Sequence, residues 1–400
     1  MKKHLFLFLF LCTLLFLIAC RPAETPTTEL FTTPESDFAS PVGDHSVSLV
    51  FVNAGKADCV LLYADEKLYC IDTGLDTSVE TIAYAIGCLS DFPIDTIEAV
   101  FFTHGDRDHI GGYPGLSQVF AIRQTYAPWY ASDPTVFTTL DPEVSLLRAG
   151  TSVPIGDDGL YLDVLAPLSR SVDDNDNSLV LRLICGDTTM LFTGDMRETE
   201  RTALLAAYPD ALHADIWKTP YHGRADSVTK ELLDAVNPQY SFVCADRVTH
   251  PDSADETCLA LLSETSSVYV TEDATLGWHV TLSENSEIIV VDLCPDTVPS
   301  NTLEIGEIDT KNQCITLVNT GADTDLSGCI VKIEPSEALF RIPNGTLLAS
   351  GESLTIGSRA DTAELLWQTE EKLLRKKKSD TITVYAPTGA PLCTAESNTK

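Results

Sequence analysis

The stretch Phe101-Phe102-Thr103-His104-Gly105-Asp106-Arg107-Asp108-His109-Ile110-Gly111-Gly112 decides the fold and the chemistry of this chain. It completes an apolar run, Ile94–Phe102, that predicts a buried strand. The polar residues after the strand carry two imidazoles and two carboxylates: His104, Asp106, Asp108 and His109. Side chains of these types packed so closely are unfavourable without a cation between them, and the two glycines that follow let the backbone turn sharply. The stretch therefore predicts a metal site at the end of a strand rather than an ordinary polar loop.

The spacing of these residues is similar to the signature His-x-His-x-Asp-His of the metallo-β-lactamase superfamily. Here Asp106 stands in place of the second histidine, which gives His-x-Asp-x-Asp-His followed by Ile-Gly-Gly. This variant resembles the branch that contains the soluble domain of the DNA-uptake channel ComEC and its free-standing secreted relatives. The resemblance requires the other motifs of that branch to follow in order along the chain.

The chain is strongly acidic, with a net charge of −33 and a pI of about 4.4. Such a surface repels polyanions at long range, so tight binding of nucleic acid requires a metal and a local basic patch. The basic run Arg375–Lys378 is either a solvated turn or a contact for phosphate or the cell wall.

Residues 1–20 resemble a bacterial lipoprotein signal peptide. Two lysines precede an apolar run, Leu5–Ile18, that is too short to span a bilayer comfortably and is followed by Ala19 and Cys20. The resemblance implies cleavage before Cys20 and acylation of that cysteine; an ordinary secretory signal is the alternative. Residues 21–45 are rich in Pro, Thr, Glu and Ser and predict a flexible tether. The protein is therefore expected to be lipid-anchored on the extracytoplasmic side of the cell membrane.

A folded domain is expected over residues 46–294, beginning with two strands around the turn Asn53-Ala54-Gly55-Lys56-Ala57-Asp58. In the ComEC-like branch this turn usually reads Asp-Val-Gly-Gln-Gly-Asp. Asp58 matches that pattern, whereas Asn53 and Lys56 depart from it. This turn therefore resembles that of the ComEC-like branch only in part.

Two further aspartates follow predicted strands. Asp72 matches the superfamily aspartate that supports the metal loop without binding the metal, a role that we also expect for Asp58. A turn or helix cap is the alternative for Asp72. Asp195 follows the strand Leu191–Thr193 and a glycine, and it matches the carboxylate that bridges two metals in the family.

The third superfamily motif is usually a histidine before a strand, and this chain has none at that place. The run Asp173-Asp174-Asn175-Asp176-Asn177 fills it, directly before the strand that begins at Ser178. The ComEC-like branch also has an Asn-rich stretch here, so the departure supports the branch. It implies that one metal position lacks an imidazole; an acidic surface loop is the alternative.

The next motif is Lys218-Thr219-Pro220-Tyr221-His222-Gly223, where the branch usually shows His-His-Gly-Ser. His222 aligns with a metal-binding histidine. Tyr221 replaces the first histidine, and it either donates a hydrogen bond to substrate or merely packs. His250, in Thr-His-Pro, matches a histidine near the mouth of the site in that branch, although an ordinary surface histidine explains it equally well.

These ordered matches imply an α/β fold, the αββα sandwich of the metallo-β-lactamase superfamily, with metals at one edge. After a composition break at residues 295–299, short alternating strands with regular turn residues predict a second domain that is all-β. The short sequence motifs over residues 305–394 resemble those of the lamin tail domain, an immunoglobulin-like sandwich. Two folded domains are therefore expected.

The resemblance implies two divalent metal ions, Mn²⁺ or Zn²⁺, with Mg²⁺ as a further choice. One position is formed by His104, Asp106 and Asp195, completed by solvent or a residue of 174–177. The other is formed by Asp108, His109, Asp195 and His222. Water activated as hydroxide by the metals then attacks phosphorus or a carbonyl carbon, and the residues essential for this catalysis are Asp108, Asp195 and His222.

The motifs and the net charge leave three functions open. The first is a phosphodiesterase or nuclease acting on extracellular nucleic acid, which the ComEC-like motifs favour. The second is hydrolysis of a small ester, lactone or lactam, which the acidic charge favours slightly. The third is a surface binding protein with a degraded metal site, suggested by Asn53, Tyr221 and Arg224. Nucleic acid or a small phosphodiester is thus the expected partner, and no protein partner is implied.

Overall fold

The computed structural model describes residues 45–157, 159–282, 287–295, 302–369 and 372–397. The predicted signal peptide, with Cys20, lies outside the described residues, and so does the predicted tether up to residue 44. Within the described ranges, no helix is both long and apolar enough to cross a membrane.

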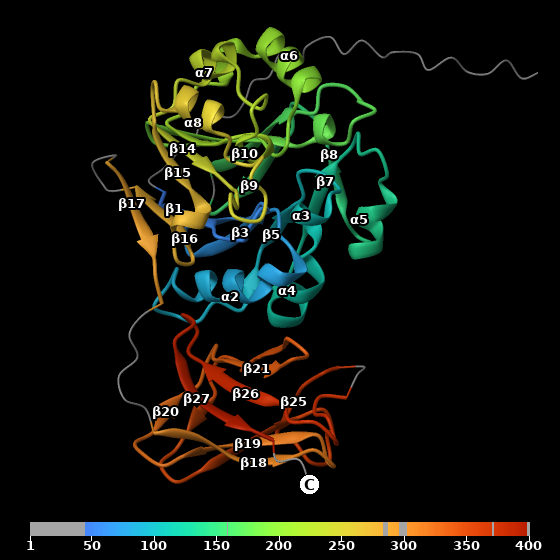
Figure 1. The fold of residues 1–400 in the computed structure, drawn as a ribbon, viewed down its shortest axis with the longest axis vertical. Coiled ribbons are helices and arrows are strands. Elements are labelled where there is room, and N and C mark those ends of the chain that lie inside the picture. Colours follow the sequence, from blue (N-terminus) through green and yellow to red (C-terminus); the bar gives the residue numbers. More distant parts are fainter. Residues whose placement is uncertain (1–44, 158, 283–286, 296–301, 370–371, 398–400) are drawn as a thin grey trace, which may run out of the picture. The chain divides into compact units, whose positions relative to one another are not determined.

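Two β-sheets face each other in the first folded domain (Figure 1). The larger sheet contains, in spatial order, β17 (Ile288–Leu293), β16 (Gly277–Leu282), β1 (Val47–Val52), β2 (Val60–Ala64), β3 (Lys67–Ile71), β5 (Ala99–Phe101), β7 (Thr125–Pro128) and β8 (Ser145–Leu147). The second contains β15 (Ser267–Val270), β14 (Tyr240–Val243), β13 (Ile216–Lys218), β12 (Thr188–Phe192), β11 (Val180–Cys185), β10 (Leu160–Ala166) and β9 (Ser152–Ile155).

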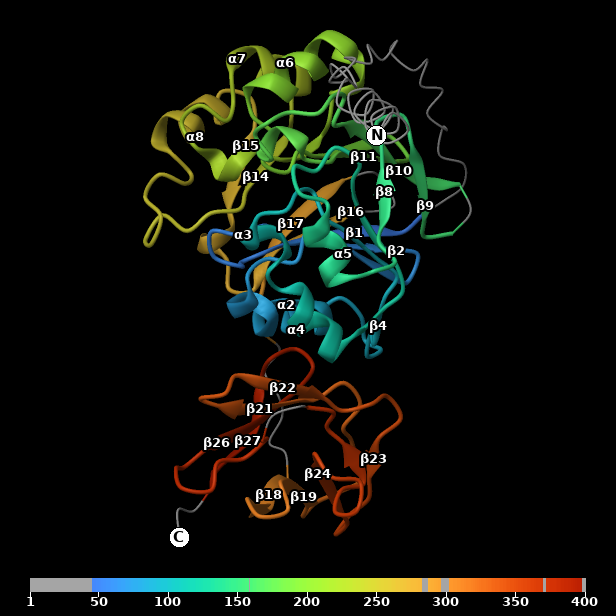
Figure 2. The same cartoon turned by 90° about the vertical axis from the view of Figure 1, so that its right-hand side faces the viewer.

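The inner faces of the two sheets bury a shared apolar core. In it, Phe51 of β1 stacks on Phe242 of β14 with ring centroids 3.9 Å apart. The outer face of the first sheet packs against α2 (Val79–Gly87) and α4 (Tyr113–Val119). The outer face of the second packs against α6 (Glu198–Ala207), α7 (Lys230–Val236) and α8 (Glu256–Leu262) (Figures 1 and 2). This layer order confirms the predicted α/β sandwich for this domain.

The strand predicted over residues 94–102 forms as two shorter pieces. β4 (Thr96–Ile97) pairs with β6 (Ala121–Ile122), whereas β5 enters the large sheet between β3 and β7. Glu98 lies between the pieces, and its backbone N–H donates to the Leu68 carbonyl. The long strand was therefore wrong in detail, because the two halves of the run pair with different neighbours.

The pattern Thr77-Ser78-Val79-Glu80 predicts a capping box at the start of α2, but the structure differs there. A 3₁₀ turn, Asp76–Ser78, precedes the helix, and no side chain caps it. The Glu80 carboxylate accepts a hydrogen bond from the Tyr84 hydroxyl at 2.8 Å, one turn later, instead of bonding back to the first turn. The capping-box prediction is wrong for this reason.

The C-terminal region is rich in β-structure, as its sequence pattern predicts. One sheet contains β18 (Leu303–Asp309), β19 (Cys314–Asn319), β24 (Ser353–Gly357) and β25 (Leu365–Leu366), and another contains β22 (Ala338–Arg341), β21 (Ile330–Glu334), β26 (Thr381–Tyr385) and β27 (Pro391–Glu396). A two-stranded sheet is formed by β20 (Thr324–Asp325) and β23 (Leu347–Leu348). Side chains from these sheets enclose an apolar core that includes Trp367.

Candidate metal centre

The candidate centre lies where strands of the two sheets of the first domain end. β3, β5 and β7 run parallel to one another, and so do β12, β13 and β14. The carboxyl ends of parallel strands deliver their loops to one edge of a sheet, where binding sites of α/β proteins gather. The loop after β5 supplies His104 and leads into a short helix, α3 (Arg107–Ile110); Asp195 follows β12 and His222 follows β13.

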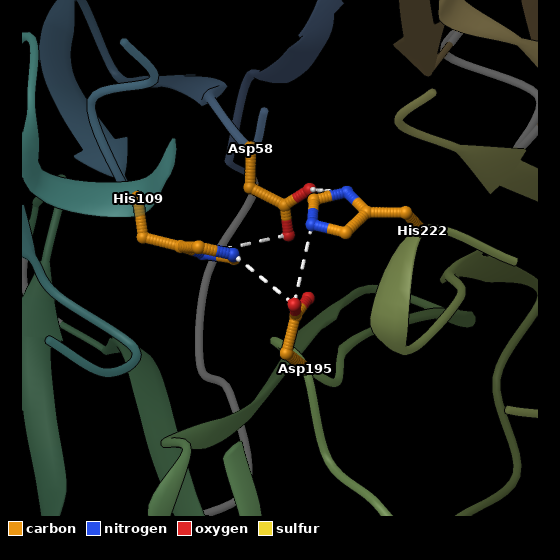
Figure 3. A group of neighbouring side chains, drawn as sticks. All are labelled: Asp58, His109, Asp195 and His222. Carbon is orange, nitrogen blue, oxygen red and sulfur yellow. Dashed lines mark ion pairs between the residues drawn. The ribbon is translucent and has the colours of Figure 1, made fainter. Parts of the chain in front are cut away.

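The imidazoles of His109 and His222 both reach the Asp195 carboxylate (Figure 3). The Nε2 atom of His109 lies 3.4 Å from Asp195 Oδ2, and the Nε2 atom of His222 lies 3.2 Å from the same oxygen. Asp108 Oδ2 is 3.3 Å from His222 Nε2. His109, Asp195 and His222 are fully buried, so these polar atoms meet in a space that is shielded from solvent.

Hydrogen bonds on the far side of each ring fix which nitrogen faces the centre. His222 Nδ1 lies 2.9 Å from the Cys244 carbonyl oxygen, which can only accept, so Nδ1 carries the proton and donates. His109 Nδ1 lies 2.7 Å from Asp72 Oδ2 and donates to it in the same way. Both Nε2 atoms therefore point inward, the arrangement by which outer hydrogen bonds orient imidazole ligands of metals.

Asp72 holds the whole metal loop. It accepts hydrogen bonds from the Thr103 backbone N–H and hydroxyl, each at 2.7 Å, in addition to the bond from His109. Its own backbone is left-handed, with φ at 59°, which is uncommon for a residue with a side chain. Asp72 is thus placed to support the loop rather than to bind a metal.

His104 contributes a third imidazole beside the first two. Its Nε2 atom is 3.5 Å from Asp106 Oδ2, and its ring lies 4.0 Å from the ring of His109. His104 is completely buried, whereas the Asp106 side chain is 57% exposed and stands at the mouth of the site. The cation position predicted from His104, Asp106 and Asp195 stays a prediction, because the potential ligand atoms that gather within 4.8 Å of one another in the described residues belong to Asp58, His109, Asp195 and His222.

These nitrogen and oxygen atoms fit a divalent cation because they are buried and have no hydrogen-bond partner in the protein. The buried polar atoms at the centre without a hydrogen-bond partner are His104 Nε2, His109 Nε2, His222 Nε2, Asp195 Oδ1 and Asp58 Oδ1. A buried polar atom without a partner costs about 1–3 kcal/mol, so a cluster of them is unfavourable unless something binds there. Imidazole nitrogens and carboxylate oxygens are the ligands that zinc and manganese accept.

Asp58 lies closer to the centre than its expected supporting role suggests. Its carboxylate belongs to a group with His109, Asp195 and His222, whose potential ligand atoms all lie within 4.8 Å of one another (Figure 3). However, Asp58 Oδ1 is 3.4 Å from His222 Nδ1, on the side of the ring that faces away from the centre. Asp108 approaches the Nε2 side and is the better fourth ligand at this position.

Lys218 is a functional residue that the sequence did not reveal. It ends β13, it is 2% exposed, and its ammonium forms an ion pair with Asp58 Oδ2. It also donates to the Gly194 carbonyl at 3.0 Å and lies 3.9 Å from Asp195 Oδ1. Burial alone would lower the pKa of Lys218, but the neighbouring carboxylates, Asp58 first, raise it above its usual value. The lysine is therefore charged and neutralises Asp58.

The carboxylates act on the imidazoles in the same manner. Burial alone would lower the pKa of His222, but Asp195 and Asp58 raise it to about 9. The pKa of His109 is raised against the effect of burial by Asp195 and Asp72. Without a metal, protons on the two imidazoles thus supply positive charge to this cluster, and a bound cation would displace them.

The Asp/Asn run at 173–177 ties the surrounding loops together. Asp174 accepts hydrogen bonds from the Gly105 and Ser132 backbone N–H groups at 3.3 and 2.8 Å, and Asp176 accepts from that of Arg197 at 3.0 Å. The Oδ1 atom of Asn175 is buried without a partner. The metal ligand predicted from residues 174–177 stays a prediction.

The two candidate substrate residues have different surroundings. The Tyr221 ring lies between two guanidinium groups, with Arg197 Cζ at 5.2 Å and Arg224 Cζ at 5.0 Å from its centroid. Its backbone N–H donates to the Gly194 carbonyl at 3.2 Å, beside Asp195. His250 is exposed and contacts Thr249 at 2.8 Å rather than the metal cluster. Of the two, Tyr221 is the residue whose backbone contacts the glycine next to Asp195.

Comparison with known proteins agrees with this geometry. Residues 52–246 match the family model described as the metallo-beta-lactamase superfamily. These residues form a metallo-β-lactamase superfamily domain. The matched residues include the candidate metal-binding group of Asp58, His109, Asp195 and His222.

Two curated proteins are distantly similar to this chain. Competence protein ComA of Neisseria gonorrhoeae is 24% identical over 217 residues, which cover 53% of this chain and 29% of that protein. ComE operon protein 3 of Bacillus subtilis is 25% identical over 169 residues, covering 40% and 21%. The chain thus spans less than a third of the length of either relative.

Solved structures give only distant likenesses. The metallo-beta-lactamase fold protein YhfI from Bacillus subtilis is 12% identical with a TM-score of 0.41, covering 60% of this chain and 100% of that one. Zn²⁺-bound PqqB from Methylobacterium extorquens is 13% identical with a TM-score of 0.41, covering 59% and 99%. Neither likeness carries an argument about activity.

Proposed function

We propose that this protein is a metal-dependent phosphodiesterase that cleaves extracellular nucleic acid. The observation that carries the proposal is the convergence of buried imidazole nitrogens and carboxylate oxygens that have no hydrogen-bond partner. A divalent cation bound there supplies an activated water and stabilises the negative charge that develops during hydrolysis. The resemblance of the motifs to the ComEC-like branch supports a phosphodiester as the substrate.

The residues of this chain would divide the work as follows. Asp72 and the Cys244 carbonyl hold the rings of His109 and His222 with Nε2 facing the substrate side. Asp195 presents one oxygen to both rings, and Lys218 neutralises Asp58 behind them. The centre is thus held rigid before substrate binds, which reduces the reorganisation needed in the transition state.

Tyr221 is the proposed contact for substrate beside the cations. Its guanidinium neighbours, Arg197 and Arg224, pair with Asp173 and Asp252 and so are not free positive charges. Base stacking on the Tyr221 ring and a hydrogen bond to its hydroxyl are the interactions that it offers to a nucleotide. His250 is kept as a weaker candidate, because it is exposed and lies on the neighbouring loop.

Hydrolysis of a small ester, lactone or lactam is the second candidate. A cavity of about 280 Å³ beside Tyr221 is lined by Asp173, Asp176, Glu198 and Asp226 as well as by arginines. Together with the net charge of −33, this acidic lining disfavours a long polyanion and favours a small substrate. A small phosphodiester or a short oligonucleotide agrees both with the ComEC-like motifs and with the acidic charge of the chain.

The metal preference follows from the donor types. The position with His109 and His222 suits Zn²⁺, whereas the position with His104 and two carboxylates suits Mn²⁺ or Mg²⁺. We propose that each position can accept a divalent ion, and that Mn²⁺ supports activity at least as well as Zn²⁺.

The test is to strip the protein with chelator, reload it with Mn²⁺, Zn²⁺ or Mg²⁺, and measure cleavage of single-stranded DNA and of a chromogenic phosphodiester. Asp195→Ala is expected to abolish turnover, since Asp195 faces both imidazoles, and the exposed Asp210→Ala is the matched control that should leave it unchanged. Turnover of esters or lactones without diester cleavage would favour the second candidate. Absence of activity with every metal would favour a binding protein with a degraded site.

Two further proposals concern the rest of the chain. The Ala19-Cys20 junction after an apolar run supports a lipid anchor at Cys20, which holds the protein on the extracytoplasmic membrane surface. The sequence motifs over residues 305–394 and the β-rich C-terminal sheets support an immunoglobulin-like lamin tail domain.

A further inference from the structure

Lys56 lies at the metal centre, in the turn between β1 and β2. Its ammonium nitrogen is 2.6 Å from Asp108 Oδ2. The two side chains are only 20% and 19% exposed, so solvent screens this ion pair poorly. The ammonium is therefore a fixed positive charge at the mouth of the cluster.

The oxygen that Lys56 holds is also the one that faces the metal position. Asp108 Oδ2 lies 3.3 Å from His222 Nε2, while the same oxygen accepts from Lys56. An ammonium group and a divalent cation bound to one carboxylate oxygen repel each other and compete for its electron pairs. Asp108 is thus a weaker ligand here than a carboxylate without a lysine partner.

The charge of the whole cluster points the same way. Five carboxylates and two ammonium groups surround the imidazoles: Asp58, Asp72, Asp106, Asp108 and Asp195, with Lys56 and Lys218. With neutral histidines, as metal binding requires, five negative charges meet two positive ones. One divalent ion leaves a net charge of −1 and two ions leave +1, so the positive charge of Lys56 makes the second ion less favourable than it would otherwise be. With a neutral residue at position 56, two ions would be balanced.

We propose that Lys56 is a built-in cation that limits this centre to one tightly bound divalent ion. The inference rests on the proposed binding of divalent metal by the cluster. In this arrangement Lys56 is a positioning residue that acts through Asp108, and it takes over part of the charge neutralisation that a second metal ion would provide. The second position then fills only weakly.

The test is metal stoichiometry, measured without any substrate. The chelator-stripped full chain is dialysed against buffered free Zn²⁺ and, separately, Mn²⁺, and metal per chain is determined by elemental analysis. The parent protein and Lys56→Arg should bind one ion per chain tightly. Lys56→Gln should bind two, with the weaker ion bound about ten-fold or more tightly than in the parent. Lys67→Gln is the matched control, because Lys67 pairs with Asp157 at the surface.

Circular dichroism and thermal unfolding show whether each variant is folded, and Lys56→Met provides a second neutral variant if Lys56→Gln is not. Two tightly bound ions in the parent protein, or equal stoichiometry in the parent and both neutral variants, would overturn the role of Lys56 and leave the hydrolase proposal intact. Failure of the parent and all variants to bind any metal would overturn both.

Discussion

Replacing Lys218 by methionine tests the electrostatic support of the centre. The side chains of Lys218 and Asp58 are 2% and 3% exposed, so the substitution leaves a buried carboxylate without its counter-charge. Removing one partner of a buried ion pair costs about 3–5 kcal/mol, whereas methionine fills nearly the same volume and adds little cavity cost. Since domains are stable by only about 5–15 kcal/mol, the variant should lose about a fifth or more of its stability.

The assay is urea unfolding of the metal-free protein in chelator, followed by tryptophan fluorescence and circular dichroism. With a slope of about 3 kcal/mol per M, the midpoint for this domain should fall by about 1 M or more. The matched control is Lys67→Met, because the Lys67–Asp157 pair is 40% and 72% exposed. An exposed pair contributes about 0–1 kcal/mol, so the midpoint of this control should change little.

A double variant separates lost charge from lost packing. Asp58→Asn together with Lys218→Met removes the carboxylate that the single change leaves unpaired, so part of the lost stability should return. The reasoning is refuted if Lys218→Met costs no more than Lys67→Met. It is also refuted if the double variant is no more stable than Lys218→Met alone.

Three other predictions concern separate parts of the chain. Burial raises the pKa of Glu200 to about 8, so the folded state keeps a proton that the unfolded chain releases near pH 4.5. The free energy of unfolding should therefore fall as the pH rises from 4.5 through 8. Urea midpoints measured at pH 5 and pH 8 should differ less in Glu200→Gln than in the parent protein. Cys20→Ala should release the protein from membranes or leave it unprocessed, and unchanged acylation and fractionation would refute the anchor. A chain ending near Asp296 should fold and keep its metal content and turnover of a small diester; a folded truncation that has lost both would contradict the two-domain prediction.

The metal loop could be predicted because its information is local. His104, Asp106, Asp108 and His109 are close in sequence, so a strand end and one helical turn necessarily bring them together. Asp195 and His222 were reached by the order of motifs, and the structure brings both beside His109.

The lysines could not be predicted, because their meaning depends on distant partners. Lys218 ends an apolar strand, and its pairing with Asp58 joins residues 160 positions apart in the sequence. Nothing in the local pattern distinguishes it from a lysine at the surface. The break at Glu98 was missed for a similar reason, since the neighbours of each strand piece are set by the sheet and not by the run itself.

The hydrogen bonds that orient His109 and His222 come from opposite sheets, with consequences for folding. Asp72 follows β3 of the first sheet, and Cys244 follows β14 of the second. A cation held by both rings therefore joins the two halves of the sandwich, and it can bind tightly only after both have formed. By mass action, such an ion stabilises the assembled domain over every partly folded form. At the outer face of the membrane, the supply of metal would then govern how much of this protein survives proteolysis, as well as how fast it turns over substrate.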